Sequence, residues 1–255
     1  MVSELEQVLR ERNVLAHENS GVMVCRVDNQ GMGLDLAEEF LVRSVDKRTV
    51  LYLSGGKTPN KLYEKLAKEE EIVPGAVGLV DERYGKKFHG NSNERMIRES
   101  GFLRYLEMRN IPFYPILQVD ASREETAEMY DGKLRELQSV YAQHVGILGI
   151  GADGHTAGIP AGISNFQFPI SNDLVGEYND RSGKYGERVS MSFLGLSMLD
   201  VLLVLVFGSE KKAALELVFS EGSEEEIPGR FYKRKGIAEK TLFITDQEIT
   251  PSTSL

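Results

Sequence analysis

The stretch that decides the fold is Val145-Gly-Ile-Leu-Gly-Ile150, followed at once by Gly151-Ala-Asp-Gly-His-Thr-Ala157. The first part is an apolar run of strand length bounded by glycines, a pattern typical of a buried parallel strand. The second part is a glycine-rich loop just past the carboxyl end of that strand, where open α/β sheets bind their ligands. In this loop Asp153 can hold and polarise His155, and His155 can then take a proton from water. The alternative is an ordinary turn in which Asp153 makes an Asx hydrogen bond and His155 is only exposed.

Strand and helix patterns alternate along most of the chain, and this alternation predicts the fold class. It favours an α/β fold, with a mostly parallel twisted sheet and helices on both faces. We expect one such doubly wound, Rossmann-like domain over residues 1–255, with room for a small appended sheet. The polar, glycine-rich segment 176–187 fits either a surface hairpin or a mobile flap. The predicted strands are Val22–Val27, Thr49–Leu53, Ala76–Val80, Val145–Ile150, Arg188–Phe193, Asp200–Phe207 and Thr241–Thr245, and the predicted helices are 34–44, Pro59–Ala67, one from Asn93, Ser122–Tyr141 and Glu210–Phe219.

Composition excludes several classes of protein. With 255 residues, 41% of them hydrophobic and 27% charged, the chain is ordinary for a globular protein that buries a large core. Its formal net charge of −9 argues against a nucleic-acid partner, because phosphate neutralisation needs a basic face. The lone Cys25 lies in an expected strand and allows no disulfide within the chain, which favours a buried structural thiol.

The sequence also lacks the usual signs of export or membrane insertion. No run reaches the roughly 18 apolar residues that span a membrane. The N-terminus has no basic and apolar signal-peptide layout. We therefore expect a cytoplasmic protein without a membrane partner, and we leave its oligomeric state open between a monomer and a weak dimer.

Two nucleotide-binding motifs are matched only in part. Gly149-x-Gly151-x-x-Gly154 has the spacing of the dinucleotide fingerprint, but that fingerprint needs a helix opening within the motif to receive the pyrophosphate. Here the chain runs into Gly158-Ile-Pro-Ala-Gly162, whose proline and glycines oppose a helix. Gly56-Lys-Thr58 resembles the end of a triphosphate-binding loop, which needs an earlier glycine where this chain has Leu51. We therefore expect no site of either kind.

Three further segments place polar groups at expected strand ends. Ser54-Gly-Gly-Lys-Thr-Pro59 joins a strand to a helix, so its glycines and the helix N-terminus can bind an anion. An ordinary turn, with Thr58 as N-cap and Pro59 at the first helical position, satisfies the same residues. Asp81-Glu-Arg83 follows another strand, and three consecutive charges there are commonly solvated. Lys211 in a first helical turn opposes the helix dipole, which favours an anion-binding role, with a snorkelling surface lysine as the alternative.

The order of these segments resembles the family of 6-phosphogluconolactonases, which is related to the glucosamine-6-phosphate deaminases. The resemblance implies hydrolysis of 6-phospho-D-glucono-1,5-lactone to 6-phospho-D-gluconate in the pentose phosphate pathway, without a metal or an organic cofactor. It also implies His155 as the general base that activates water and Asp153 as the group that orients it. The resembling pieces are Leu53–Pro59, Asp81–Arg83 with Asn91–Asn93, Gly149–Ala157, Arg188–Ser190, Gly208–Lys211 and Ile227-Pro228 with the closing strand.

The resemblance further implies a set of substrate-binding residues, with a phosphosugar lactone as the small-molecule partner. Arg83 and Lys211 are expected to hold the phosphate. A lactone is an activated ester, so one base and good positioning suffice, with loop N–H groups expected to stabilise the oxyanion. The full expected binding set is Ser54, Gly55, Gly56, Thr58, Asp81, Arg83, Arg188 and Lys211.

Two positions separate the chain from the related deaminases. The resembling loop of those enzymes carries a glutamate five residues after the histidine, where this chain has Pro160, and their Asp-Glu-Tyr motif corresponds to Asp81-Glu-Arg83. Both differences favour the lactonase. The lactonase pattern itself departs after Ala157, since the family typically continues Ser-Leu-Phe-Pro-Gly and this chain has Gly158-Ile-Pro-Ala-Gly162. The alternatives are therefore a deaminase-like isomerase and a non-catalytic sugar-phosphate-binding protein.

Overall fold

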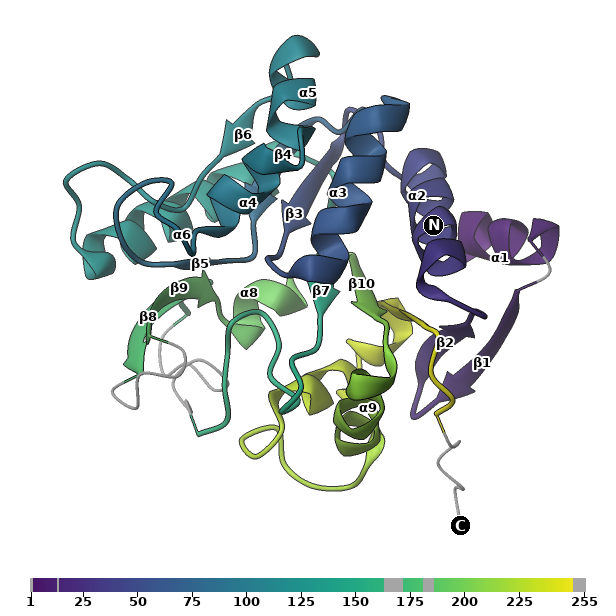
Figure 1. Cartoon of the computed structure of the whole chain (residues 1–255). Helices are drawn as coiled ribbons and strands as arrows, with labels where there is room; N and C mark the ends of the chain where they lie inside the picture. Colours follow the sequence, from purple (N-terminus) through teal and green to yellow (C-terminus); the bar gives the residue numbers. More distant parts are fainter. Residues whose placement is uncertain (1, 13, 163–171, 181–185, 250–255) are drawn as a thin grey trace.

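A computed structural model of the chain describes residues 2–12, 14–162, 172–180 and 186–249 (Figure 1). Within these residues the strands form a larger and a smaller sheet, connected and covered by helices. In chain order the elements are α1 (Val2–Glu11), β1 (Leu15–Asn19), β2 (Val22–Arg26), α2 (Gln30–Ser44), β3 (Thr49–Leu53), α3 (Lys57–Glu69), β4 (Ala76–Leu79), β5 (Asp81–Arg83), α4 (Asn93–Glu99), α5 (Phe102–Met108), β6 (Phe113–Tyr114), α6 (Arg123–Val140), β7 (Gln143–Gly149), β8 (Val175–Asp180), β9 (Gly186–Met191), α8 (Phe193–Ser197), β10 (Val201–Val206), η1 (Ser209–Lys211), α9 (Lys212–Phe219), η2 (Pro228–Lys233), η3 (Ala238–Lys240) and β11 (Thr241–Thr245).

The larger sheet has the strand order β1-β2-β11-β10-β7-β3-β4-β6. Its neighbouring strands are parallel except β1 and β2, which are antiparallel. Every residue of β3, β10 and β11 is buried, so both faces of the sheet are covered at its centre. Figure 1 shows α2 and α3 against the sheet, where α2 contacts β11 and α3 contacts β7 and β10. The predicted α/β class with a mostly parallel sheet is confirmed.

The strand order reverses between β3 and β7, and this reversal creates a crevice at the carboxyl edge of the sheet. From β3 the chain moves outward through β4 to β6, whereas from β7 it moves the opposite way through β10 to β11. The connections that leave the carboxyl ends of β3 and β7 therefore run to opposite sides. Such a switch point opens a crevice in which α/β proteins bind ligands. The chain after Leu53 and the chain after Gly149 flank this crevice.

The smaller sheet joins the larger one at Val80. The Val80 N–H donates to the Leu53 carbonyl in β3 at 2.9 Å, and the Val80 carbonyl accepts from the Met191 N–H in β9, also at 2.9 Å. The next residues form β5, which is antiparallel to β9, and β9 in turn pairs with β8. The expected small appended sheet is thus present. Of the segment 176–187, residues 176–180 lie in β8 and residues 186–187 in the antiparallel β9, and residues 181–185 lie outside the described residues.

The structure corrects two local predictions. The interpretation of Thr58 as N-cap is wrong, because α3 begins at Lys57 with Gly56 at its N-cap and no side-chain cap. Gly56 has a φ of 117°, which glycine adopts without strain, so the chain enters the helix before Thr58 and Pro59 falls in the interior of the first turn. The solvated alternative for Asp81 and Glu82 is also wrong, because both are buried where β5 pairs with β9. The predicted helix from Ser122 is present as α6, and it begins with a capping box formed by Ser122 and Glu125.

Tyr130 in α6 completes the hydrogen bonding at the end of β4. Its buried hydroxyl accepts from the Leu79 N–H at 2.6 Å and donates to the Leu79 carbonyl at 2.7 Å. Tyr130→Phe removes a partner from both buried backbone groups, so we expect the free energy of unfolding to fall by roughly 1–3 kcal/mol. Urea denaturation should show a lower midpoint with an unchanged m-value, and an unchanged midpoint would contradict this role.

Candidate active site

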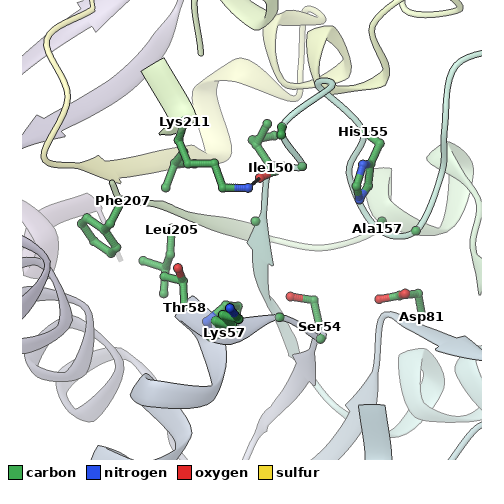
Figure 2. A pocket seen from close by; sticks show the side chains of 18 of the residues that line it. Ser54, Lys57, Thr58, Asp81, Ile150, His155, Ala157, Leu205, Phe207 and Lys211 are labelled. Atoms are coloured by element: carbon green, nitrogen blue, oxygen red, sulfur yellow. Dashed lines mark hydrogen bonds between the residues drawn. The ribbon is translucent and has the colours of Figure 1, made fainter. Parts of the chain in front are cut away.

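A pocket of about 430 Å³ lies at the carboxyl edge of the larger sheet, between the loops that follow β3 and β7 (Figure 2). Figure 2 shows His155 and Lys211 on one side of the pocket and Ser54, Thr58 and Asp81 on the other. Asp153 does not line the pocket but contacts His155. The structure therefore brings together every predicted site residue. Those that line the pocket are Ser54, Gly55, Gly56, Thr58, Asp81, Arg83, His155, Arg188 and Lys211.

The segment Gly151–Ala157, which we call the histidine loop, is shaped by its own hydrogen bonds. The Gly151 N–H donates to the His155 carbonyl at 2.8 Å, and the Gly154 N–H donates to the Gly151 carbonyl at 3.0 Å. A β-carbon at Gly151 would lie only 2.0 Å from Nδ1 and Cε1 of His155. The imidazole ring therefore packs directly on Gly151, and only glycine leaves that space.

His155 and Asp153 form a close polar pair. His155 Nδ1 lies 2.5 Å from Asp153 Oδ1, and the side chains are 31% and 37% exposed, respectively. An ionised carboxylate can only accept, so Nδ1 carries the proton and the neutral ring has its lone pair on Nε2. The His155 N–H also donates to Asp153 Oδ1, at 3.4 Å, so the Asx turn and the side-chain pair coexist. This arrangement can accept a proton at Nε2.

The loop after β3 leaves one buried hydroxyl group at the pocket. Ser54 is only 5% exposed, and its Oγ has no hydrogen-bond partner among the described residues. Buried polar groups without a partner are uncommon, and a ligand in the pocket can supply one. The neighbouring Gly55 permits close packing, since a β-carbon there would lie 2.0 Å from Asn93 Oδ1. Asn93 is held in turn by donating from Nδ2 to the Asp81 carbonyl at 2.9 Å.

Two arginines lie side by side on neighbouring strands of the smaller sheet. Arg83 in β5 pairs in register with Arg188 in β9, so their side chains leave the same face of that sheet. Burial lowers the pKa of Arg188, the nearby Asp81 carboxylate raises it, and the Arg83 charge lowers it again. Like charges placed opposite one another repel, and an anion bound between them offsets that repulsion. The pair therefore favours an anionic ligand.

The buried Glu82 carboxylate fixes the backbone around Arg83. It accepts from the N–H groups of Arg83 at 2.8 Å, Asn93 at 2.7 Å and Glu94 at 2.8 Å, and from Ser92 Oγ at 3.0 Å. Burial raises the pKa of Glu82, while these backbone donors lower it. A carboxylate at the N-terminus of α4 also interacts favourably with the helix dipole. This role of Glu82 was not predicted, because three consecutive charged residues show no pattern of burial.

Lys211 links the loop after β10 to the end of β7. Its Nζ donates to the Ile150 carbonyl at 2.8 Å (Figure 2). Lys211 ends the short helix η1 rather than lying inside the α-helix expected from residue 210. The pocket is also lined by Lys57 and Glu210, which were not predicted. Both follow the carboxyl end of a central strand, so their position in the sequence was a usable signal.

The structure also bears on the partial motifs. Residues 151–162 are all described and form turns and an isolated bridge rather than a helix, so the dinucleotide fingerprint lacks the helix that it needs, as predicted. Among the described residues, no three His, Cys, Asp or Glu side chains are grouped to hold a metal ion. No helix in the described part of the chain is long and apolar enough to cross a membrane.

Fold and site together define an α/β protein with a cation-bearing pocket at the switch point of its sheet. A family profile described as glucosamine-6-phosphate isomerases/6-phosphogluconolactonase matches residues 34–243. The chain belongs to this family, as the sequence predicted.

Relatives with a named activity agree with this membership. The chain is 34% identical over 212 residues to a 6-phosphogluconolactonase of Thermotoga maritima, covering 80% of this chain and 87% of the relative. It is 32% identical over 212 residues to a 6-phosphogluconolactonase of a Synechocystis species, covering 77% and 81%. The solved structure of the Thermotoga maritima 6-phosphogluconolactonase matches with a TM-score of 0.65 at 25% identity, covering 87% of this chain and 97% of that one. A 6-phosphogluconolactonase from Plasmodium vivax shares the fold with a TM-score of 0.74 at 17% identity, covering 94% of each chain.

Gly151→Ala tests whether the imidazole of His155 depends on the glycine beneath it. The added methyl group must displace the ring and break its contact with Asp153, so the Nδ1-protonated tautomer should be lost. In ¹⁵N-labelled protein, the His155 ring signals should report this tautomer for the wild type and not for Gly151→Ala. Gly132→Ala, at a position with open space around it, is the matched control and should leave the signals unchanged. Unchanged His155 signals in Gly151→Ala would contradict the packing described here.

Proposed function

We propose that this chain hydrolyses 6-phospho-D-glucono-1,5-lactone to 6-phospho-D-gluconate, a step of the pentose phosphate pathway. The observation that carries the proposal is His155, held by Asp153, on the wall of a pocket that also presents Arg83, Arg188 and Lys211. The relatives named as 6-phosphogluconolactonases support the same substrate.

His155 acts as the general base in this proposal. Its Nε2 takes a proton from water while the water oxygen attacks C1 of the lactone. Asp153 keeps Nδ1 protonated and stabilises the imidazolium that forms. The tetrahedral intermediate then collapses by breaking the bond between C1 and the ring oxygen, which receives the proton from Nε2. The products are the open-chain acid and its new hydroxyl group, and water is the only co-substrate.

Arg83 and Lys211 hold the phosphate, assisted by the loop Ser54–Gly56 and by Thr58. An acidic protein needs local cations to hold a dianion, and the planar arginine fork matches phosphate. Arg188, the register partner of Arg83 on the neighbouring strand, adds to the same positive region. The Asp81 carboxylate can accept hydrogen bonds from sugar hydroxyl groups.

The test is lactone hydrolysis by the purified chain, measured as acid release against the spontaneous rate, with an ammonia assay on glucosamine 6-phosphate alongside. We expect hydrolysis well above the spontaneous rate and no ammonia, because Pro160 has no titratable group to serve the deaminase relay. Binding of 6-phosphogluconate without hydrolysis would favour the non-catalytic alternative. Catalytic release of ammonia would move the chain to the deaminase side of its family.

His155→Asn removes the base but keeps a polar side chain of similar size. We expect kcat for the phosphorylated lactone to fall roughly 10²–10⁴-fold, because general-base catalysis contributes on that order. The dissociation constant of 6-phosphogluconate, measured by calorimetry, should change little. A variant with near-wild-type kcat would remove His155 from the mechanism.

Arg83→Ala and Lys211→Ala test the phosphate contacts. Each removes charge-assisted hydrogen bonds, so kcat/KM for the phosphorylated lactone should fall roughly 10–100-fold. Activity on unphosphorylated glucono-1,5-lactone should stay nearly constant, so the preference for the phosphorylated substrate should shrink. Lys212→Ala, an exposed neighbour that does not line the pocket, is the control. A wild-type protein that hydrolyses both lactones equally well would show that no phosphate contact exists.

Several expectations from the sequence stay predictions. They are the cytoplasmic location, the lack of a nucleic-acid or membrane partner, the lack of a metal or organic cofactor, and the organisation of residues 1–255 as one domain.

A further inference from the structure

The short helix η2 lies directly behind the histidine loop. The Gly229 N–H of η2 donates to the Gly154 carbonyl at 2.8 Å. A β-carbon at Gly154 would lie 2.7 Å from Cγ2 of Ile227, and one at Gly229 would lie 3.0 Å from the Gly154 carbonyl oxygen. The two segments therefore meet at glycines, with no room for a side chain on either.

A second contact joins η2 to the residue that follows His155. The Tyr232 hydroxyl lies 2.6 Å from Thr156 Oγ1, and Thr156 Oγ1 donates to the Gly149 carbonyl at 3.0 Å. Because the single hydroxyl proton of Thr156 goes to Gly149, Tyr232 must be the donor in its bond with Thr156. Both residues are buried: Tyr232 is fully buried and Thr156 is only 1% exposed. This chain of hydroxyl groups fastens the end of the histidine loop to the last residue of β7.

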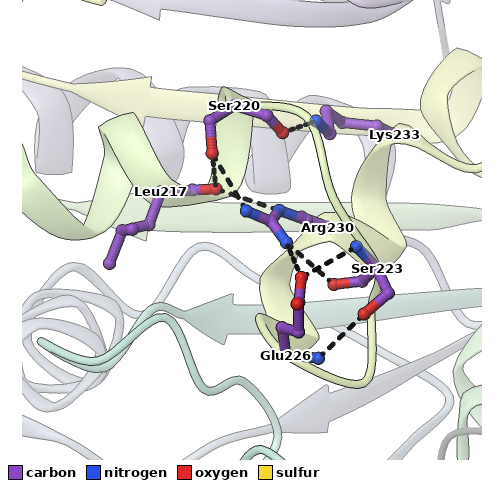
Figure 3. A network of polar contacts seen from close by, with 6 residues as sticks. All are labelled: Leu217, Ser220, Ser223, Glu226, Arg230 and Lys233. Atoms are coloured by element: carbon purple, nitrogen blue, oxygen red, sulfur yellow. Dashed lines mark hydrogen bonds and ion pairs between the residues drawn. The ribbon is translucent and has the colours of Figure 1, made fainter.

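Arg230 anchors η2 itself, as Figure 3 shows. Its side chain is buried, and its guanidinium donates to the Leu217 carbonyl at 3.2 Å, the Ser223 carbonyl at 3.0 Å and Ser220 Oγ at 3.0 Å. It also pairs with Glu226 at 3.0 Å. Arg230 thus connects η2 to the end of α9 and to the loop that follows. These bonds fix the position of η2, and with it the positions of Gly229 and Tyr232.

We propose that Tyr232 and Arg230 are positioning residues for the reaction. They act through η2 on the histidine loop and keep the His155 ring where it can take a proton from water. The proposal rests on the proposed function of His155. Misplacing a reacting group by about 1 Å can lower the rate roughly 100-fold. The contacts that η2 makes with the histidine loop therefore affect kcat.

The test compares Tyr232→Phe with Tyr105→Phe in the full chain. Both remove the hydroxyl of a buried tyrosine, but Tyr105 donates to the Ile72 carbonyl at 2.5 Å, with the Glu70 carbonyl as a longer, shared acceptor at 3.2 Å, away from the pocket. We expect Tyr232→Phe to lower kcat roughly 10-fold or more with little change in KM, because the substrate contacts remain. Tyr105→Phe should lower only the midpoint of unfolding. The ¹⁵N ring signals of His155, assigned with His155→Asn, should shift in Tyr232→Phe and not in Tyr105→Phe.

Arg230→Gln is a second variant, at a residue that contacts the histidine loop only through η2. It should show the same fall in kcat and a shifted His155 signal. Wild-type kcat and an unshifted signal in Tyr232→Phe would overturn the proposal. A loss of kcat no larger than that of Tyr105→Phe at equal loss of stability would overturn it as well. If the wild type has no lactonase activity, the proposed function fails, while the His155 signals of the same variants still decide whether η2 positions the ring.

Discussion

The parallel register of β4, β3, β7 and β10 is the constraint on which the site depends. Parallel strands end at the same edge of a sheet, so four loops that are distant in the sequence meet there. The reversal of strand order between β3 and β7 then separates two of these loops and leaves the crevice that holds the pocket. Val80 belongs to the connection after β4, and its hydrogen bonds to Leu53 of β3 and Met191 of β9 carry the chain from the larger sheet into β5 of the smaller one. Base, cations and hydroxyl groups are thus assembled by topology before any ligand arrives.

Close packing at glycines gives the site its precision. Gly151 seats the His155 ring, and Gly55 seats the Asn93 side chain, each at a distance that no β-carbon permits. The pocket has a positive region although the chain carries a net charge of −9, because Arg83 and Arg188 lie next to each other on neighbouring strands. Repulsion between them is a cost to the empty protein, and an anionic ligand offsets it. Functional sites commonly retain such unfavourable local arrangements.

The sequence patterns predicted correctly those strands whose residues are all buried in the centre of the sheet. β3 and β11 cover the predicted Thr49–Leu53 and Thr241–Thr245, since strands buried on both faces of a parallel sheet are nearly continuous apolar runs. The edge strand β1 was not predicted, because Leu15–Asn19 is mostly polar and becomes a strand by pairing with β2. The strand β5 was missed for the same reason, since its three charged residues are held by β9.

The predicted site residues lie together at one edge of the sheet, and this could be predicted because the ends of the strands are recognisable in the sequence. The bond between Tyr232 and Thr156, which are 76 residues apart, depends on tertiary packing that no local pattern contains.

The most direct test of this account is a crystal structure of the chain with bound 6-phosphogluconate. We expect the C1 carboxylate, the product of water attack, to lie within hydrogen-bond distance of His155 Nε2, while Asp153 keeps its contact with Nδ1. The phosphate should lie against Arg83 and Lys211 near the loop Ser54–Gly56. A product bound with its phosphate at His155, or with its carboxylate out of reach of that ring, would contradict the account.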